Sequence, residues 1–347
     1  MNKDILYNKK DRKILKKELA AESFNRITCS FYRYVAIENP SLSRDTLYKE
    51  WNQLQIFGRV YISHEGINAQ VSCPEHKWNS FIKSINSYDA FKGIPVKRAV
   101  RDGRSFYKLV IKVKKEIVAY KISDEDYDMG SVGSHLNAQE FNDRLEKENA
   151  IAVDMRNYYE SEVGKFEEAI IPDVDTSREL LPAVKKMLNG RESDPILLYC
   201  TGGIRCEKAS SYLIKNGFKN VSQLNGGIIQ YAHEVQEKGI RSKFRGKNFV
   251  FDERMGESIT DDVIGKCHQC NTPADSHIDC GNDACHILFI QCKKCNTTYD
   301  GCCSKECKEF ASLPIEEQRV LRKDPQKVVS KSRYSSKIKP KLRELRN

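Results

Sequence analysis

Long apolar segments are absent from this chain of 347 residues. No run of about eighteen consecutive apolar residues occurs, and a run of that length is what marks a candidate membrane helix. Residues 1–17 are rich in lysine and are followed by no apolar core segment, so they do not have the pattern of a secretory signal peptide. We therefore expect a cytoplasmic protein that has no membrane partner.

The signatures of the common redox cofactors are absent as well. The chain contains neither the glycine pattern of a dinucleotide-binding loop nor a haem motif. It also shows no arrangement of two histidines and one carboxylate that would hold non-haem iron. The sequence thus predicts no flavin, NAD or haem, and it identifies no source of oxidising power.

Cysteine is plentiful, with 13 residues in the chain. Because no export signal accompanies them, so many cysteines argue against a disulfide framework and favour metal binding or redox chemistry in a reducing compartment. The chain is also long enough for two or three domains, each with a core of its own.

One cysteine, Cys200, lies in the most informative segment. Residues 195–199 have the pattern of a short buried strand and residues 207–216 that of a helix, so the loop between them lies at a helix N-terminus. Unpaired backbone N–H groups and the helix macrodipole favour an anion there. With the cation of Arg205, they predict a Cys200 thiol of lowered pKa that acts as a nucleophile. A buried structural cysteine is the alternative. The anion-binding loop consists of Thr201, Gly202, Gly203 and Ile204.

The length of this loop narrows the chemistry. Residues 200–205 form a smaller ring than the loop of cysteine phosphatases with this architecture, which is one residue longer and holds a tetrahedral phosphate. A smaller ring suits a single sulfur atom. Together with 152–156 and 221–227, the loop resembles the strand signatures of a rhodanese domain, and the resemblance implies that Cys200 carries a persulfide. Rhodaneses commonly have Gly-His where this chain has Gly164 and Lys165, so no role for a histidine carries over.

The segment 26–122 has the pattern of a separate α+β domain. Its expected elements follow the order β-α-β-β-α-β, with room for one further strand, which predicts a ferredoxin-like domain of the acylphosphatase shape. The expected strands cover 27–37, 59–63, 67–72, 95–100 and 106–113, and the expected helices cover 44–57 and 75–87.

Polar residues of this domain suggest two further roles. His64, Glu65 and Asn68 surround a tight turn, where they could either act in catalysis or simply stabilise the hairpin. An aromatic and basic face could likewise cradle nucleic acid or be ordinary solvated surface. This face consists of Tyr32, Arg33, Lys97, Arg98, Arg101 and Arg104.

A basic extension at 1–25 precedes this domain, and an acidic linker at 123–136 follows it. The rhodanese-like unit spans 137–240, and its pattern predicts an α/β fold with a parallel sheet that helices cover on both faces. Cys200 would then lie at the carboxyl ends of the strands, where such sheets bind ligands.

Nine cysteines gather in the region 241–313. Cys267 with Cys270, and Cys292 with Cys295, have the spacing of a zinc ribbon, in which each pair presents two thiolates to one tetrahedral ion. We predict structural zinc; an iron–sulfur cluster and unmetallated redox thiols are the alternatives. A second site could use Cys280, Cys285, Cys302 or Cys303, and Cys307, with His268, His277 and His286 as substitutes.

The net charge of +10 is concentrated at the C-terminal end of the chain. Residues 319–347 contain eleven Lys and Arg against two acidic residues, a net +9. Such a polar segment cannot bury enough apolar surface to fold, and we expect a disordered tail over 314–347. The tail could bind an RNA backbone, or it could be a solvated appendage.

Several long runs of sequence resemble one family, the bacterial rhodanese-domain tRNA uridine hydroxylases. The resemblance extends over about residues 27–307, and the runs that carry it are 57–61, 64–69, 200–209, 246–255 and 267–270 with the cysteines that follow. It implies an oxidoreductase that uses O2 to convert the wobble uridine of tRNA to 5-hydroxyuridine. Composition and spacing alone indicate no more than a sulfurtransferase with a basic RNA-binding arm.

The sequence leaves the mechanism open. Cys200 could bear a persulfide, form a sulfenic acid or attack C6 of the pyrimidine, and Cys206 could resolve an oxidised Cys200 or serve only as a packing residue. Two other functions also stay open. A persulfide-based sulfurtransferase acting on tRNA or on a sulfur carrier would need Cys200 but no oxygen. A non-catalytic zinc-dependent RNA-binding module would need the tail and the cysteine cluster but not Cys200.

Overall fold

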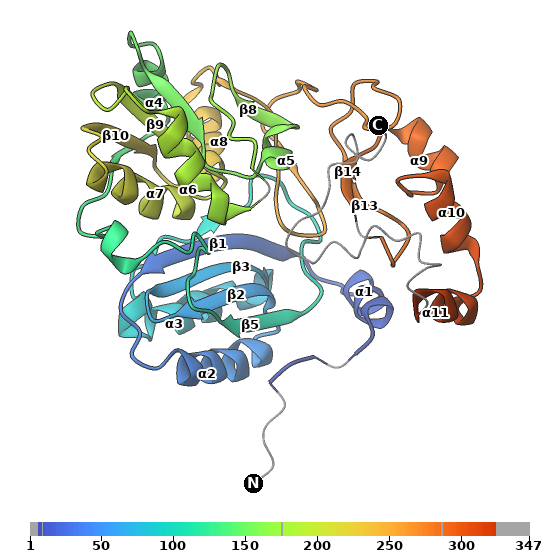
Figure 1. Cartoon of the computed structure of the whole chain (residues 1–347). Helices are drawn as coiled ribbons and strands as arrows, with labels where there is room; N and C mark the ends of the chain where they lie inside the picture. The colour runs from blue at the N-terminus through green and yellow to red at the C-terminus, as the bar shows by residue number, and fades with distance from the viewer. Residues whose placement is uncertain (1–5, 9, 175, 286, 324–347) are drawn as a thin grey trace.

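A computed structural model of the chain describes residues 6–8, 10–174, 176–285 and 287–323. Figure 1 shows an N-terminal domain in blue and cyan, an α/β domain in green and yellow, and a cysteine-rich C-terminal region in orange and red. His286 and the basic segment 324–347 lie outside the described residues. Our expectations for that histidine and for an RNA-binding tail therefore stay predictions.

The N-terminal domain is built on a five-stranded sheet of order β4-β1-β3-β2-β5. β3 is antiparallel to both of its neighbours, whereas β5 is parallel to β2. This arrangement confirms the predicted acylphosphatase-like fold with one further strand. The elements are β1 (Arg26–Tyr34), α2 (Pro40–Gln53), β2 (Phe57–Ser63), β3 (Gly66–Pro74), α3 (Trp78–Asn86), β4 (Lys97–Arg98) and β5 (Leu109–Val113).

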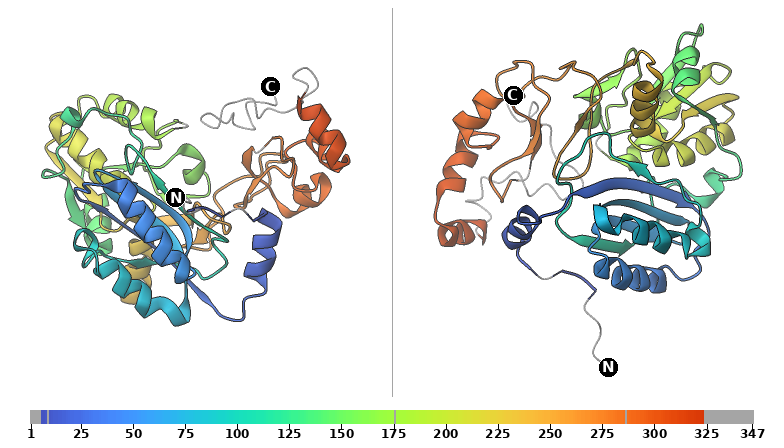
Figure 2. Two further views of the ribbon diagram at one scale, coloured as in Figure 1. Left: turned by 90° about the horizontal axis from the view of Figure 1, so that it is seen from below. Right: turned by 180° about the vertical axis from the view of Figure 1, so that it is seen from behind.

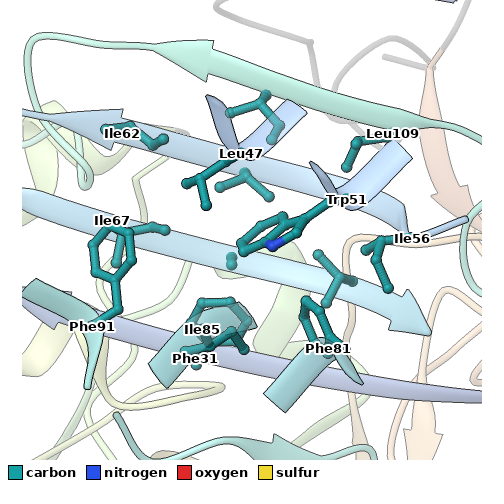
Figure 3. Packing of buried hydrophobic residues seen from close by; sticks show 14 of the residues in the cluster. Phe31, Leu47, Trp51, Ile56, Ile62, Ile67, Phe81, Ile85, Phe91 and Leu109 are labelled. Atoms are coloured by element: carbon teal, nitrogen blue, oxygen red, sulfur yellow. The ribbon is translucent and has the colours of Figure 1, made fainter. Parts of the chain in front are cut away.

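The two faces of this sheet carry different side chains, because successive residues of a strand point to opposite sides. Phe31 of β1 belongs to the apolar core between the sheet and the helices α2 and α3. Figure 3 shows this core around Trp51 of α2, whose ring lies 5.4 Å from that of Phe81 of α3. The alternate residues of β1, such as Ser30 and Tyr32, point to the other face. Figure 1 shows that this other face is turned toward the α/β domain.

Most element boundaries in this domain differ from the prediction by a few residues, those of α2 and β4 among them. The helix α2 begins at Pro40 rather than at residue 44, because the Asn39 side chain accepts a hydrogen bond from the backbone N–H of Leu42 at 3.0 Å and caps the helix. Proline suits the first helical position. The strand expected over 95–100 is reduced to the two residues of β4, and Pro95 before it has no N–H to offer a neighbouring strand.

The α/β domain has a parallel sheet of order β6-β10-β9-β7. Leu181 of α6 and Leu213 of α7 pack on one face, and Phe141 of α4 and Ile228 of α8 pack on the other. The predicted parallel sheet with helices on both faces is confirmed. The elements are β6 (Ser134–Leu136), α4 (Ala138–Leu145), β7 (Ile151–Asp154), α5 (Tyr158–Ser161), β8 (Gly164–Phe166), α6 (Ser177–Met187), β9 (Pro195–Tyr199), α7 (Ile204–Lys215), β10 (Asn220–Leu224) and α8 (Gly227–Lys238).

The cysteine-rich region is joined to the α/β domain by strand pairing, since its first strand β11 is antiparallel to β8. The helix α1 (Arg12–Ala20) of the basic extension also contacts this region, because Arg12 and Lys16 form ion pairs with Glu253. The elements are β11 (Phe244–Asn248), β12 (Glu257–Ser258), β13 (His277–Asp279), β14 (Leu288–Ile290), α9 (Lys293–Tyr299), α10 (Lys305–Ser312) and α11 (Ile315–Lys323).

The helix α11 corrects our expectation of a disordered tail that starts at residue 314. Acidic residues in its first turn and basic residues in its last turn complement the helix macrodipole. The amide of Gln318 donates hydrogen bonds to the backbone carbonyls of Ala311 and Leu313, at 3.2 and 2.8 Å, and ties the helix to α10. The charge count alone did not reveal these local contacts.

The three parts lie against one another rather than in a row. Seen from behind, the sheet of the N-terminal domain lies under the α/β domain, and the cysteine-rich region runs along one side of both (Figure 2). Within the described residues, no helix combines the length and the apolar character needed to cross a membrane.

Candidate active site

Cys200 follows the last residue of β9 and precedes α7, which begins at Ile204 rather than at the predicted residue 207. The Cys200 side chain is fully buried, with 0% of its surface exposed. Its Sγ accepts a hydrogen bond from the backbone N–H of Gly203 at 3.1 Å. Gly203 adopts a φ of 97°, which a residue with a Cβ rarely adopts. The loop therefore bends its backbone toward the sulfur.

The groups around Cys200 determine the ionisation of its thiol. Burial alone would raise the pKa. It is outweighed by a hydrogen bond from Cys206, by the positive charge of Arg205 and by the backbone N–H groups of Arg205 and Gly203, which together lower the pKa from 9.0 to about 6. At neutral pH the sulfur is therefore mostly a thiolate.

The cation of Arg205 is held by Glu160, a residue that the sequence analysis missed. The two carboxylate oxygens of Glu160 lie 2.7 and 2.9 Å from the two terminal guanidinium nitrogens of Arg205. Both side chains are buried, at 0% and 10% exposure. The pair fixes the orientation of the guanidinium, and the carboxylate offsets part of its positive charge.

A sequence signal for Glu160 was available. Asn157 and Glu160 have the spacing of a capping box, and they follow directly after a buried strand. In the structure, the Glu160 carboxylate accepts a hydrogen bond from the backbone N–H of Asn157 at 2.9 Å and another from the Thr201 hydroxyl at 3.3 Å. The helix α5 therefore positions the carboxylate against the loop.

The N-terminal domain contributes two side chains to the mouth of the loop. The Tyr32 hydroxyl donates a hydrogen bond to the Glu207 carboxylate at 3.0 Å. The same hydroxyl would lie only 2.7 Å from a Cβ added to Gly203, so it approaches the loop closely. The Lys97 ammonium stands 4.6 Å from the centre of the Tyr32 ring. Burial lowers the pKa of Lys97 to about 8, although the negative charges of Cys200 and Glu207 oppose this shift. A second domain thus completes the surroundings of the reactive loop.

The turn at His64 and Glu65 lies at the interface between the domains. The Glu65 carboxylate accepts hydrogen bonds from the Lys208 ammonium and from the backbone N–H of Ile117, both at 2.7 Å. Lys208 lies on α7 and is only 1% exposed. The Asn68 amide donates to the Ile117 carbonyl at 3.2 Å. These contacts fix α7, and with it the loop, against the N-terminal domain.

A cavity of about 330 Å³ lies where the three parts of the molecule meet. The loop residues Thr201, Gly202 and Arg205 form one wall, the outward face of the N-terminal sheet forms another, and residues 250–257 of the cysteine-rich region close the side. This volume is in the range of pockets that bind small molecules or single nucleosides. The reactive loop therefore faces a pocket that no single domain encloses.

Cys206 lies on the first turn of α7 and is fully buried in the apolar core of the α/β domain. Burial and the hydrogen bond to Cys200 raise the pKa of the Cys206 thiol well above its usual value. Cys206 therefore stays protonated and donates to the Cys200 thiolate. A role for Cys206 in resolving an oxidised Cys200 stays a prediction.

The cysteine-rich region brings eight thiols together in two groups, and within each group all four sulfur atoms lie within 4.8 Å of one another. The groups are Cys267, Cys270, Cys292 and Cys295, and Cys280, Cys285, Cys303 and Cys307. Among the described residues, Cys302, His268 and His277 belong to neither group. The His268 ring nitrogen lies 3.2 Å from a Glu162 carboxylate oxygen, and the His277 ring packs edge-on against Phe249. Either group could hold a metal ion.

The first thiol group is packed against the loop's supporting helix. Cys267 and Cys295 share one apolar cluster with Val163, and Tyr159 of α5 packs against this cluster. Because α5 also carries Glu160, the packing of the cysteine-rich region against α5 helps to fix the position of the carboxylate that holds Arg205.

These features define a class of protein in which a rhodanese-type loop lies beneath an acylphosphatase-like sheet and beside a cysteine-rich region. Family models agree with each part. The "UPF0176 acylphosphatase like domain" matches residues 26–117, the "Rhodanese-like domain" residues 137–234, and the "Rhodanase C-terminal" model residues 245–308.

Similarity to curated proteins extends over nearly the whole chain. A "tRNA uridine(34) hydroxylase" of Leptospira interrogans is 51% identical over 98% of this chain and 93% of its own length. Proteins of the same name from Photorhabdus laumondii and Escherichia fergusonii are each 48% identical, over 95% of this chain and 95% of their own lengths. The chain belongs to the tRNA uridine(34) hydroxylase family, which confirms the resemblance that the sequence predicted.

Proposed function

We propose that this protein converts the wobble uridine of tRNA to 5-hydroxyuridine, with O2 as co-substrate and Cys200 as the reactive group. One oxygen atom of O2 enters at C5, and an external two-electron reductant reduces the other to water. The observation that carries the proposal is the similarity to proteins named tRNA uridine(34) hydroxylase over 98% of the chain. A thiolate beside a pocket of about 330 Å³ supports it, because the pocket is large enough for a single base turned out of an RNA loop.

The residues around Cys200 favour an anionic sulfur. Cys206, the backbone N–H groups and Arg205 stabilise negative charge at the Sγ, and Glu160 keeps the guanidinium in place. A persulfide forms when an external sulfane-sulfur donor transfers its outer sulfur atom to the thiolate and leaves with the bonding electron pair. It would extend the reactive sulfur by about 2 Å, one S–S bond, beyond the fully buried Sγ. We therefore favour the persulfide over direct attack by the buried thiolate on C6 of the uracil.

Nucleoside analysis of tRNA from a deletion strain tests this function. The strain is complemented with the wild-type protein or with Cys200→Ala, and the hydroxylated wobble uridine is measured by mass spectrometry. The proposal expects the modified nucleoside only with the wild-type protein. Equal amounts with both proteins would remove Cys200 from the reaction.

A sulfurtransferase acting on tRNA or on a sulfur carrier is the second candidate, because residues 137–234 match a rhodanese-like domain and the loop stabilises an anionic sulfur. The same analysis separates the two functions. A sulfurtransferase that acts on tRNA would be marked by loss of a thiolated uridine, with the hydroxylated nucleoside unchanged.

We also propose that each group of four thiols binds one structural zinc ion. Four sulfur atoms at 2.3 Å from a tetrahedral zinc ion lie about 3.8 Å apart. The distances Cys270 to Cys292, Cys285 to Cys303 and Cys303 to Cys307, between Sγ atoms, are 3.6, 3.7 and 3.6 Å. Metal analysis of the purified protein should find two zinc ions per chain; iron with visible absorbance would instead indicate a cluster.

A further inference from the structure

Three polar side chains form a row on the outward face of the N-terminal sheet. Gln70 of β3 lies directly opposite Ser30 of β1 on one side and Arg59 of β2 on the other. The three residues are therefore neighbours at the strand spacing of about 4.8 Å. All three line the pocket whose opposite wall is the Cys200 loop. The row faces the reactive loop across the pocket.

Within the described part of the chain, the polar groups of this row have no hydrogen-bond or ion-pair partner. The Ser30 hydroxyl oxygen is buried and has no hydrogen-bond partner there. Likewise, no hydrogen bond or ion pair to another described residue engages the Gln70 amide or the Arg59 guanidinium. Buried polar groups in folded proteins are normally paired. The buried, unpaired Ser30 hydroxyl, beside the half-buried Gln70 amide and the exposed Arg59 guanidinium, points to a ligand that pairs with this row.

The rest of the pocket wall suits a flat ring. Phe106 and Phe251 line the same cavity, together with the aliphatic side chain of Ile229. Aromatic and apolar side chains are what enclose a base that has been turned out of its stack. An apolar enclosure with polar groups along one edge is thus present beside the reactive loop.

Resting on the function proposed above, we propose that this pocket binds the flipped-out uracil and that Gln70 recognises the edge of the base. Uracil presents one N–H donor between two carbonyl oxygens, and a glutamine amide offers the complementary acceptor and donor side by side. Arg59 is exposed beside Gln70 and binds the phosphate of the same nucleotide, since a guanidinium matches phosphate geometry. The sheet of the N-terminal domain therefore holds the base against the Cys200 loop.

Binding to two RNA hairpins tests the proposal. Both carry the anticodon stem-loop sequence, one with uridine at the wobble position and one with an abasic site there. The variants Gln70→Leu and Gln70→Glu keep the side-chain size but remove the amide, and we expect each to reduce the preference for the uridine hairpin about tenfold. Arg59→Gln should weaken binding of both hairpins alike and make the slope of log affinity against log salt shallower by about one.

Lys83→Gln is the matched control for Arg59→Gln, because Lys83 is exposed on α3 on the opposite side of the sheet. It should leave both affinities and the salt dependence unchanged. Urea unfolding of each variant shows whether the fold is intact, and having two substitutions at Gln70 guards against loss of one variant through misfolding.

The outcomes separate this inference from the proposed function. If complemented cells make the hydroxylated uridine with the wild-type protein but both Gln70 variants keep the wild-type preference between hairpins, the base-binding role of Gln70 is wrong. If Arg59→Gln behaves like Lys83→Gln, the phosphate-binding role is wrong. If the wild-type protein restores no hydroxylated uridine at all, the proposed function itself has failed.

Discussion

Cys73 in the N-terminal domain and Cys200 in the loop are equally buried, since both are 0% exposed, yet their thiols have opposite character. Burial raises the pKa of Cys73 to about 12, although Arg26 and Lys77 oppose the shift. Burial also acts on Cys200, but there the pKa falls to about 6. Cations are near both sulfur atoms. A nearby positive charge is therefore not what separates the two thiols.

The direction of the hydrogen bonds separates them. The Cys73 thiol donates to the backbone carbonyl of Pro74 at 3.3 Å, an interaction that requires its proton. The Cys200 sulfur accepts hydrogen bonds from the Cys206 thiol and from the backbone N–H of Gly203, and both favour the thiolate. The loop between a strand and a helix N-terminus supplies such donors, whereas the end of a strand in an antiparallel sheet does not.

The largest expected effect comes from substituting each of the two cysteines in a separate variant. Cys200→Ser should lower the yield of hydroxylated uridine by about a thousandfold or more, because the hydroxyl does not ionise near neutral pH. Cys73→Ala should retain most of the activity and lose stability instead, by about 1 to 3 kcal/mol, since it leaves a small cavity in the core. Nucleoside analysis and urea unfolding measure the two effects. If Cys200→Ser kept activity within a few-fold of wild type, the ionised Cys200 thiol would not be what distinguishes the loop from the site of Cys73.

The thiols of the cysteine-rich region form a third environment, in which sulfur atoms neighbour one another. Replacing Cys267 and Cys270 with serine should remove one metal ion per chain and destabilise the protein by about 4 kcal/mol or more. Metal analysis and thermal unfolding check this result. The matched variant Cys302→Ser changes a buried thiol outside both groups and should retain both metal ions. Full metal content in the double variant would contradict the zinc ribbon.

Breaking the ion pair behind the loop should have the next largest effect. Glu160→Gln leaves the buried Arg205 without its carboxylate and should cost about 3 to 5 kcal/mol of stability. It should also lower the pKa of Cys200 further, because the guanidinium charge is then uncompensated. Glu146→Gln, which removes an exposed partner of Lys243, should cost less than about 1 kcal/mol. Equal losses in urea unfolding would show that Glu160 has no special role.

The smallest expected effect concerns Lys97, the cation that the N-terminal domain brings to the loop. In the wild-type protein, thiolate absorbance that is missing from Cys200→Ser should rise with pH around a midpoint of about 6. Lys97→Met removes a positive charge near the sulfur and should move this midpoint upward, so that the reaction below pH 7 slows a few-fold. Lys92→Met, at an exposed position five residues earlier in the chain, should leave the midpoint in place. An unmoved midpoint in Lys97→Met would restrict the control of Cys200 to its own domain.

Much of the fold was predictable because the local patterns are strong. The buried strand 195–199 coincides with β9, and the order of elements in the N-terminal domain agrees with the five-stranded sheet. The predicted helix boundaries were wrong where a short-range hydrogen bond decides the structure and residue composition does not. Asn39 starts α2 early through a side-chain cap, and Gln318 ties α11 to α10 in a segment whose charge suggested disorder.

The site was only partly predictable, because its remaining members come from distant parts of the chain. The loop around Cys200 is contiguous, so its pattern is visible in sequence. Tyr32 and Lys97 reach the loop from another domain. Gln70 lies on β3, where the alternation of apolar and polar residues predicts which side of the sheet a side chain is on but not what it faces. No spacing rule links these residues to residue 200. Only the docking of the sheet on the α/β domain brings them together.

One isotope measurement tests the central claim, that the Cys200 loop directs hydroxylation of uridine with oxygen from O2. A deletion strain complemented with the wild-type protein or with Cys200→Ala is grown under 18O2, and the wobble nucleoside of its tRNA is analysed by mass spectrometry. We expect 5-hydroxyuridine that carries one 18O atom with the wild-type protein, and none of this nucleoside with the variant. Unlabelled 5-hydroxyuridine with the wild-type protein, or labelled nucleoside with Cys200→Ala, would contradict the account.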